Sequence, residues 1–235
     1  MPDEIVFLDA STVTRGDIDF SRLEALGNLT CYDTSQGEEI DERLAGATIA
    51  ISNKAVISRS VMENCPQLRL IVAAATGMNH IDLDAATDHD IKAMNVAGYS
   101  TPSVAQHVIT FLTTFATSLH RFTPEAALWP KSPIFTRLDY PTVDLAGRTL
   151  GIVGLGEIGR ATARAARALG MHVQALAREG STSEADIPRV SEEKFLASSD
   201  AITLHCPLTE KTEKWVNQTR MDQMKDSVWL IDTVR

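Results

Sequence analysis

The sequence predicts an α/β protein with two doubly wound domains, each built on a parallel sheet. Short apolar stretches alternate with stretches of helical spacing over residues 1 to about 100, and this alternation is typical of parallel sheets with helices on both faces. A second alternating region begins at Thr149–Arg160, where an apolar strand pattern runs into a glycine turn and then into a helix.

The first domain is expected to contain strands and helices in strict alternation. The strand candidates are the apolar stretches Glu4–Asp9, Asn28–Tyr32, Ala47–Ser52, Leu68–Ala74 and Ile91–Asn95. The helix candidates between them are Asp17–Leu26, Glu38–Leu44, Ser58–Asn64 and Leu83–His89. Each helix lies between two strands, as a parallel sheet requires for its crossover connections.

Turn-forming residues interrupt this alternation at Gly98–Ser103. Pro102 lies within this stretch and disfavours a helical conformation for the residue before it. We therefore expect a domain boundary here, with one domain over residues 1–100 and a second over residues 101–235.

A long apolar helix is expected after the boundary, over Pro102–His120, with Thr101 or Ser103 as its N-cap. Its apolar face is broad, so we expect it to be buried between the domains or against a second subunit. Residues 122–143 contain four prolines, which predicts an ordered linker without a regular element.

The motif GxGxxG is formed by Gly154, Gly156 and Gly159. In a dinucleotide-binding Rossmann domain the first glycine permits the tight turn, the second lets a pyrophosphate approach the backbone, and the third lets the helix pack closely on the strand. We expect that helix over Ala161–Leu169 and the next strand over Met171–Ala177. A glycine turn without a ligand is the alternative, and the strand and helix on its two sides favour the dinucleotide site.

The residue that reads the cofactor ribose is expected at the end of strand Met171–Ala177. No carboxylate ends this strand, and Arg178, with Ser181 and Thr182 nearby, suits a 2′-phosphate. We therefore favour NADP(H) as the cofactor. NAD(H) stays open as the alternative, because Glu179 offers a carboxylate to a ribose 2′-hydroxyl.

The alternation continues to the end of the chain. Ser191–Lys194 is expected to open a helix with an acidic first turn, and Ala201–His205 and Ser227–Asp232 are expected to be buried strands.

Composition excludes several classes of partner. The net charge is −9 and no block of Lys or Arg occurs, so nucleic acid is not expected to bind. No leader pattern and no apolar run of membrane-spanning length is present, so neither secretion nor a membrane is expected. The three cysteines, Cys31, Cys65 and Cys206, lie far apart without a CxxC motif. We interpret them as reduced thiols of a cytoplasmic protein, without a disulfide or a metal site.

Several ordered motifs together resemble one family. They are Ala74–Asp82 (AATGMNHID), Asn95–His107 (NVAGYSTPSVAQH), Gly151–Gly159 (GIVGLGEIG), Leu204–Thr209 (LHCPLT) and Leu230–Arg235 (LIDTVR). Their order and separation resemble the D-isomer-specific 2-hydroxyacid dehydrogenases along the whole chain. Residues 132–141 resemble most the glycerate dehydrogenase, or hydroxypyruvate reductase, branch. The resemblance implies a flavodoxin-like substrate domain followed by a Rossmann domain that binds NAD(P).

The resemblance implies a substrate site in the first domain. Thr76 and Gly77 are expected to hold the substrate carboxylate through backbone N–H groups, which a glycine turn at a strand end can present to one anion. Met78 follows them in the same loop. Lys54 either adds positive charge at the mouth of the site or is an ordinary solvated lysine.

The resemblance also implies the cofactor residues of the second domain. Besides the three motif glycines and Arg178, these are Glu157, Ile158, Cys206, Pro207, Thr212 and Thr233. Glu157 and Ile158 are expected along the pyrophosphate and ribose. Cys206 and Pro207 are expected beside the adenine or the nicotinamide ribose, with Cys206 as a pocket wall; a redox-active thiol is the alternative reading.

Arg235 is the catalytic residue that the resemblance implies. A guanidinium stays charged and can grip both the carboxylate and the carbonyl oxygen of the substrate. The family also uses a histidine, tuned by a glutamate, to transfer the proton, and both would follow Arg235. The Rossmann domain is therefore expected to be incomplete at its C-terminus, and this chain alone is expected to turn over poorly. Asp232 replaces the usual Asn of the family.

Three functional hypotheses follow. The first is a dehydrogenase that reduces hydroxypyruvate, glyoxylate or a similar 2-oxo acid, and family analogy favours a homodimer. The second is a non-catalytic module that binds dinucleotide or a partner, because the proton-transferring pair is missing. The third is a formate or phosphite dehydrogenase of the same superfamily. Structural roles are expected for His80, His107 and His205.

Overall fold

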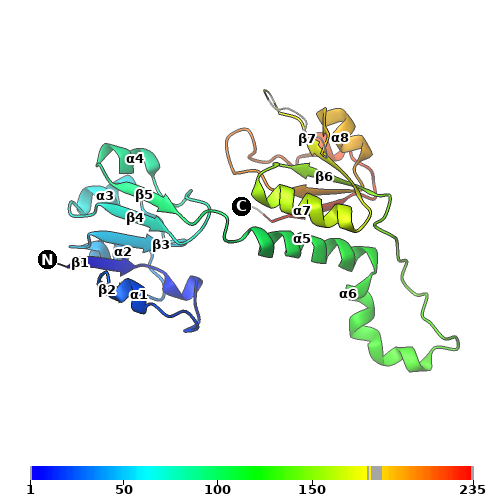
Figure 1. The fold of residues 1–235 in the computed structure, drawn as a ribbon, viewed down its shortest axis with the longest axis horizontal. Coiled ribbons are helices and arrows are strands. Elements are labelled where there is room, and N and C mark those ends of the chain that lie inside the picture. The colour runs from blue at the N-terminus through cyan, green and yellow to red at the C-terminus, as the bar shows by residue number, and fades with distance from the viewer. Residues whose placement is uncertain (1, 179, 181–186, 234–235) are drawn as a thin grey trace. The chain divides into compact units, whose positions relative to one another are not determined.

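The computed structural model describes residues 2–178, 180 and 187–233. The chain divides into two compact units, Met1–Tyr99 and Ser100–Arg235, here named unit 1 and unit 2 (Figure 1). Each unit contains a five-stranded sheet whose strand pairs are all parallel. The predicted α/β architecture with two parallel sheets is confirmed.

Unit 1 has the strand order β2-β1-β3-β4-β5. The strands are β1 (Asp3–Phe7), β2 (Gly27–Cys31), β3 (Ile49–Ser52), β4 (Leu70–Ala73) and β5 (Lys92–Asn95). The α-helices are α1 (Ser21–Glu24), α2 (Glu38–Leu44), α3 (Arg59–Asn64) and α4 (Leu83–Asp88), and a 3-10 turn, η1, covers Ala10–Thr12. All these strands agree with the predicted positions to within two residues at each end.

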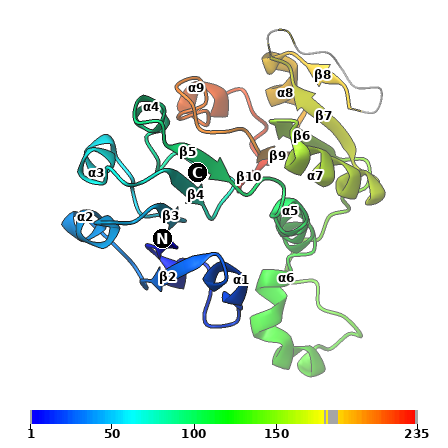
Figure 2. The same cartoon turned by 60° about the vertical axis from the view of Figure 1, so that its left-hand side comes forward.

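Alternating strand residues of unit 1 enter two apolar clusters, one on each face of the sheet. Val6 and Leu8 pack with the apolar residues of α2, α3 and α4, whereas Ile5 and Phe7 pack with Phe20 and the other apolar residues beside α1. Figure 2 shows α2, α3 and α4 along one face and α1 on the other. The strand period of two therefore decides which helices each side chain meets.

The helix predicted over Asp17–Leu26 is wrong in its length, because only α1 forms. The Thr14 hydroxyl accepts hydrogen bonds from the backbone N–H groups of Gly16, Asp17 and Ile18. Asp19 likewise accepts from the N–H of Ser21 at 2.9 Å. These local bonds occupy backbone donors before the helix begins, as short polar side chains commonly do.

Unit 2 has the strand order β10-β9-β6-β7-β8. The strands are β6 (Thr149–Val153), β7 (His172–Leu176), β8 (Arg189–Val190), β9 (Ala201–Leu204) and β10 (Trp229–Asp232). The α-helices are α5 (Thr101–Ala116), α6 (Leu119–Phe122), α7 (Glu157–Ala168), α8 (Glu192–Ser198) and α9 (Gln218–Met221), and a long 3-10 helix, η2, covers Thr123–Lys131. One face of the sheet packs against α5 and α7, and the other packs against α8, Trp215 and Met224.

The apolar face of α5 is buried inside unit 2. Val108, Leu112 and Ala116 join the same apolar cluster as β6 and α7. This part of the face is covered within unit 2 itself, whereas Phe111 and Leu119 are exposed, so burial between the domains or against a second subunit stays a prediction for the rest of the face. The N-cap is Ser100, without a side-chain hydrogen bond, so the predicted capping by Thr101 or Ser103 is also wrong.

The predicted linker over residues 122–143 contains regular structure, because α6 and η2 extend through Lys131. Ser118 adopts a left-handed conformation with φ of 50°, which ends α5 and lets a new helical segment begin. Pro124 lies in the first turn of η2, where its missing N–H removes no hydrogen bond. Pro124, and also Pro130 inside η2, are therefore compatible with helical structure in this segment.

Helix α7 begins at Glu157, four residues before the predicted start. Gly159 consequently lies in its first turn and faces the strand, where a Cβ would collide with the Gly154 carbonyl oxygen and lie 3.2 Å from Ile152 Cγ2. The backbones of β6 and α7 thus approach so closely that no side chain fits between them.

We expect Gly159→Ala to destabilise the protein by about 1 to 3 kcal/mol, because the added methyl group forces helix and strand apart. Urea unfolding followed by circular dichroism measures this loss. Gly156→Ala is the matched control, since a Cβ at Gly156 meets nothing within 4 Å. Equal stability of the two variants would contradict the expectation.

Candidate functional site

The turn after β6 lies directly against the end of β9. Gly154 has a φ of +98°, and a Cβ there would lie 2.6 Å from the Cys206 nitrogen and the His205 carbonyl carbon. Glycine is required both for this backbone conformation and for this contact. The contact brings the loop after β9 beside the glycine turn.

The start of α7 adjoins open space at Gly156. Gly156 is the N-cap of the helix, and no atom lies within 4 Å of the place that its Cβ would take. Glu157 and Ile158 follow in the first turn. The first N–H groups of a helix have no partner inside the helix and attract anions. This turn therefore suits a phosphate group.

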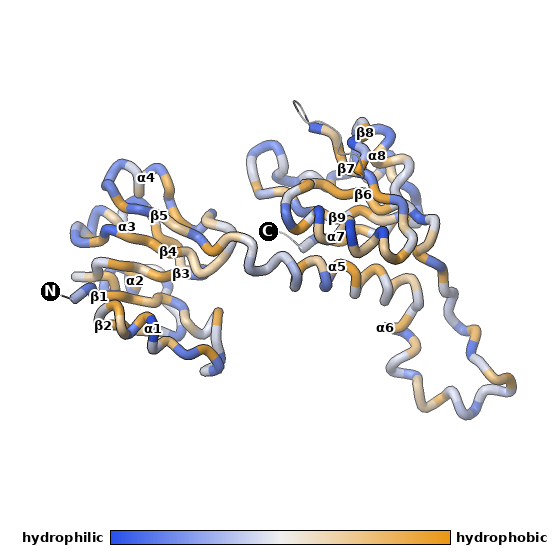
Figure 3. The backbone as a smooth tube through the Cα atoms, in the orientation of Figure 1, coloured by the Kyte–Doolittle hydropathy of each residue, from blue (hydrophilic) through white to orange (hydrophobic). Residues whose placement is uncertain are grey.

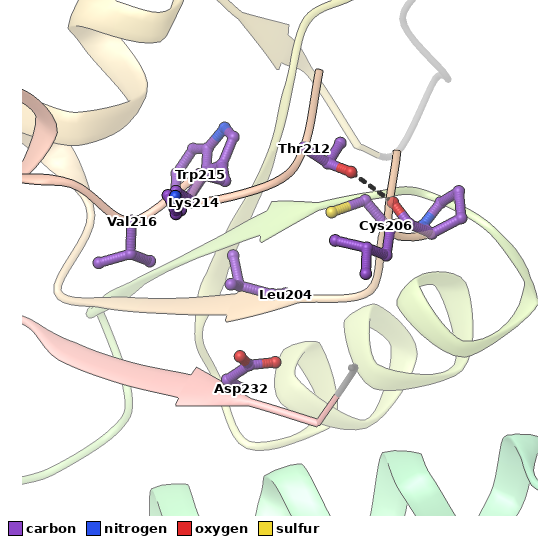
Figure 4. Close-up of a pocket in the computed structure, with 9 residues that line it drawn as sticks. Leu204, Cys206, Thr212, Lys214, Trp215, Val216 and Asp232 are labelled. Atoms are coloured by element: carbon purple, nitrogen blue, oxygen red, sulfur yellow. Dashed lines mark hydrogen bonds between the residues drawn. The ribbon is translucent and has the colours of Figure 1, made fainter. Parts of the chain in front are cut away.

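A cavity of about 250 Å³ opens beside the end of β9. It is lined by Leu204, Cys206, Pro207, Leu208, Thr212, Lys214, Trp215, Val216 and Asp232 (Figure 4). The wall is mainly apolar, with a hydroxyl, an ammonium and a carboxylate at separate positions. Such a lining suits a flat ring with a few polar groups.

Thr212 gives the loop of this cavity its shape. Its hydroxyl lies 2.6 Å from the Pro207 carbonyl oxygen, to which it donates, and it accepts from the Thr209 N–H at 2.8 Å. The loop from Pro207 therefore folds back on itself and closes one side of the cavity. Trp215, only 5% exposed, packs edge to face on Phe195 and anchors the loop in the core.

Sequence reasoning identified three of the residues that line this cavity, namely Cys206, Pro207 and Thr212. It missed Leu204, Leu208, Lys214, Trp215 and Val216. Leu204 and Leu208 belong to the motif LHCPLT, so the motif could have indicated them. Nothing in the sequence indicated that the segment from Pro207 to Trp215 folds around this cavity.

Cys206 is half-buried in the cavity wall. Burial is the main cause that raises the pKa of its thiol. A raised pKa keeps the neutral thiol, which is a poor nucleophile. Its position and its pKa favour the role of a pocket wall over that of a redox-active thiol.

A second cavity, of about 530 Å³, lies in unit 2 beside Asp232 and Thr233. Ser103, Val104 and His107 of α5 form its other side. Thr233 was expected at the cofactor, whereas the three residues of α5 were not assigned to a site. Asp232 lines both cavities, so it lies between them.

His205 connects three elements of unit 2 through its ring. Nε2 lies 3.1 Å from Thr203 Oγ1 and 3.4 Å from Thr162 Oγ1, and Nδ1 lies 3.3 Å from Thr233 Oγ1. Burial lowers the pKa of His205 to about 4, and the negative charge of Asp232 opposes this shift. The neutral ring can donate from one nitrogen and accept at the other, so it ties the end of β9 to α7 and to the residue after β10.

Arg178 follows the end of β7 and is exposed. Neither Ala177 nor Arg178 offers a carboxylate at this strand end. Glu179, Ser181, Thr182 and Arg235, which complete the sequence-based assignment, lie outside the described residues.

The substrate residues implied by the resemblance lie at one edge of the unit 1 sheet. Lys54 follows β3 and Thr76 follows β4, and these strands are parallel neighbours, with Ser52 opposite Ala73. Asn95 donates to the Thr76 carbonyl at 2.7 Å, and the Thr76 hydroxyl donates to the Val96 carbonyl at 3.2 Å.

These bonds fix the first residue of the Thr76–Gly77 turn against the end of β5. Gly77 is exposed, and Met78 is partly buried against the core of unit 1. The turn therefore has an anchored start and an open glycine, and Lys54 is exposed on the neighbouring loop.

No group of three His, Cys, Asp or Glu side chains that could hold a metal ion occurs among residues 2–178, 180 and 187–233. Within the same residues, no helix has the length and apolar character needed to cross a membrane.

We expect the ring protons of His205 to titrate near pH 4 in an NMR pH series. The unfolded chain takes up this proton near pH 6.5, so the free energy of unfolding falls as the pH drops from about 6.5 towards 4, by about 3 kcal/mol in total. His205→Asn identifies the resonance by its loss. A midpoint at or above pH 6 would show that the ring is not held neutral by burial.

Comparison with known proteins identifies the family. The family model "D-isomer specific 2-hydroxyacid dehydrogenase, NAD binding domain" matches residues 113–235. A hydroxypyruvate reductase of Blautia hydrogenotrophica is 36% identical over 99% of this chain and 74% of its own length. A glycerate dehydrogenase of Methylorubrum extorquens is 37% identical over 84% of this chain and 62% of its own length.

A solved structure has the same fold. The D-lactate dehydrogenase of Aquifex aeolicus, described in complex with NAD and lactic acid, has a TM-score of 0.85 and 27% sequence identity, and the match covers 99% of this chain and 69% of that one. The glycine turn and the cavity beside β9 thus lie in a domain of a known dinucleotide-binding type. The chain belongs to the D-isomer specific 2-hydroxyacid dehydrogenase family, and it is an oxidoreductase of 2-hydroxy acids that uses a nicotinamide dinucleotide.

Proposed function

We propose that the protein reduces a small 2-oxo acid, hydroxypyruvate or glyoxylate, with NADPH, and that the reverse reaction oxidises glycerate or glycolate. The observation that carries this proposal is the juxtaposition at the carboxyl edge of the unit 2 sheet. There Gly154 lies against the chain at Cys206, so the open helix start at Gly156 and the cavity wall of Cys206 and Pro207 belong to one surface.

The residues present fit a dinucleotide. The open space at Gly156 accommodates a pyrophosphate against the first N–H groups of α7, with Glu157 and Ile158 along it. Cys206, Pro207 and Thr212 line a cavity that suits an adenine or nicotinamide ribose. Thr233 lines the second cavity. We assign unit 2 as the cofactor domain, over residues 101–235, and residues 1–100 as the substrate domain.

We propose that the guanidinium of Arg178 binds the 2′-phosphate of NADPH. Among the described residues, no carboxylate follows β7 that would accept from a ribose 2′-hydroxyl, whereas a guanidinium at that place favours a phosphate. NADH is the competing cofactor, with Glu179 as the residue that would receive its ribose.

The substrate carboxylate is proposed to bind at Thr76 and Gly77, whose loop offers backbone N–H groups at a strand end, beside Met78. Lys54 on the neighbouring loop adds positive charge. Arg235 is proposed to grip the carboxylate and the carbonyl oxygen, because its planar donors match both groups.

When bound, a reduced nicotinamide dinucleotide would supply the hydride that adds to C2 of the 2-oxo acid, and a proton taken up from solvent would complete the hydroxyl group. Arg235 polarises the carbonyl bond by stabilising the charge that develops on its oxygen. The proposed substrates share a carboxylate beside the reacting carbonyl, so the same groups that bind the anion also orient C2.

A homodimer is proposed through the arm formed by residues 118–143, in place of the helix after the boundary. Its exposed apolar residues are Leu128, Trp129, Ile134, Phe135 and Leu138. Apolar and polar positions alternate along the arm in the hydropathy colouring of Figure 3. Phe135 is 94% exposed, an arrangement that supports contact with a second copy.

The arm is held in shape by its own polar contacts. Arg137 pairs with Glu125 at 2.8 Å, and Tyr140 donates to Glu125 at 2.7 Å. These bonds limit the entropy that the arm would lose on binding a second copy. A cytoplasmic location is proposed as well, supported by the three cysteines, which are free thiols.

The first test is enzymatic. We expect hydroxypyruvate to cause loss of NADPH absorbance at 340 nm, and Arg235→Lys to lower kcat/KM by about 10²- to 10³-fold while the dissociation constant of NADPH stays the same. NADPH binding without turnover of hydroxypyruvate, glyoxylate or formate by the native protein would favour a non-catalytic dinucleotide-binding module. Turnover of formate alone would favour the formate dehydrogenase alternative.

The second test concerns the cofactor. We expect Arg178→Ala to weaken NADPH binding about tenfold and to leave NADH binding within about twofold, because only the former loses a charge-assisted contact. Fluorescence titration with each nucleotide measures both constants. Arg164→Ala, on the exposed side of α7, removes the same charge away from the ribose position. Tighter binding of NADH than of NADPH to the unaltered protein would contradict the assignment of Arg178.

A further inference from the structure

A buried carboxylate of unit 1, that of Asp9, belongs to none of the proposed substrate or cofactor residues. Asp9 follows β1 and is only 2% exposed. It accepts three backbone hydrogen bonds from one loop, namely from the N–H groups of Asn53 at 2.9 Å, Lys54 at 2.5 Å and Ala55 at 2.8 Å. Burying a carboxylate is costly unless its oxygens are satisfied, and here the backbone of the Lys54 loop satisfies them.

The position of this contact in the sheet is informative. The strand order places β1 between β2 and β3, so the chain leaves β1 towards one side for β2 and returns to the other side for β3. Ligands of open α/β sheets bind outside the carboxyl ends of the strands at such a topological switch point. Asp9 and Lys54 follow the two strands that flank it.

Further bonds hold the same loop. The Asn53 amide donates to the Thr12 hydroxyl at 2.9 Å, and the Thr12 hydroxyl in turn donates to the Asp9 carbonyl at 2.7 Å. Ser52 donates to the Ala55 carbonyl at 2.7 Å, which closes the loop across Lys54. The backbone of Lys54 is thus fixed on both sides while its side chain is exposed.

The loop also adjoins the proposed anion site. The Ser52 carbonyl accepts from the Ala74 N–H at 2.8 Å, and Ala74 lies two residues before Thr76. The fixed Lys54 loop and the Thr76–Gly77 turn therefore start from directly bonded strand ends. On a chain with a net charge of −9, a local ammonium group at this edge is the kind of feature that attracts an acidic substrate.

We propose that Asp9 is a positioning residue that holds the Lys54 loop so that the lysine ammonium assists the binding of the substrate carboxylate at Thr76 and Gly77. This inference rests on the proposed function. Asp9 itself touches neither substrate nor cofactor. Its carboxylate acts through the three N–H groups, and the residue that meets the anion is Lys54.

A double-mutant cycle tests the inference with Asp9→Asn, Lys54→Met and the combined variant. Two constants are measured: the KM for hydroxypyruvate and the calorimetric dissociation constant of oxalate in the presence of NADP⁺. We expect each single substitution to raise both constants about tenfold, and the combined variant to match Lys54→Met, because the two residues act through one contact. The kcat and the NADPH dissociation constant stay within about twofold.

Thr48→Val is the matched control. Thr48 bonds to Glu4 N–H and to Asp3 at 3.0 Å each, so it joins the same pair of strands at the opposite end of the sheet. We expect this variant to leave both substrate constants unchanged.

Three outcomes would overturn the inference: additive effects in the cycle, unchanged constants in Lys54→Met, or no binding of oxalate to the unaltered protein. Lys54 is exposed, so Lys54→Met remains informative even if Asp9→Asn fails to fold. The two claims can fail separately. If oxalate binding follows the expected cycle but the protein does not turn over hydroxypyruvate, the result supports the role of Asp9 and contradicts only the proposed function.

Discussion

A close backbone approach in unit 2 is the constraint on which the proposed cofactor surface depends. The turn at Gly154 presses against the chain at His205 and Cys206, and Gly159 presses α7 against the same turn. Because no Cβ fits at either glycine, strand, turn and helix meet at backbone distance. That approach brings the loop after β9 to the turn that precedes α7, and it is the reason why we assign the proposed anion donors and the cavity wall to one cofactor site.

Around this contact, the side chains of unit 2 fix the loops that form the walls. Thr212 folds the loop back onto the Pro207 carbonyl, and the buried Trp215 anchors its far end. On the other side of β9, the neutral His205 ring contacts hydroxyls from three elements. Its burial keeps it uncharged, so it can bridge them without carrying a buried charge.

In unit 1, polar side-chain contacts, rather than close backbone approaches at glycines, hold the loops at the carboxyl edge of the sheet. The carboxylate of Asp9 and the amide of Asn95 each hold a loop at the carboxyl edge of the sheet. In both units, therefore, the sheet supplies a rigid edge and a few specific contacts decide where the loops lie. This division explains how one architecture serves many substrates, since the loops can change while the sheet persists.

The regular elements of the sheets followed from local pattern. Apolar runs such as Leu70–Ala73 and Ala201–Leu204 are continuous because parallel strands are buried on both faces, and these runs alone located the strands. Local pattern failed where side chains competed with the backbone, as at Thr14 and Asp19 before α1, and where proline was compatible with a helix, as at Pro124. Local pattern also failed to predict that α5 packs against β6 and α7, because an apolar helix face indicates burial but does not indicate which element covers it.

The sequence by itself determined the fold class, the glycine turn and the family, since each depends on residue types at fixed spacing along the chain. Only the tertiary structure brought Trp215 and Asp232 to the cavity of Cys206, and Ser103 and His107 to the cavity of Thr233. It alone showed that Asp9 holds the loop of Lys54, across more than forty residues of sequence. Contacts between distant segments depend on strand order and loop path, and neither leaves a periodic trace in the sequence.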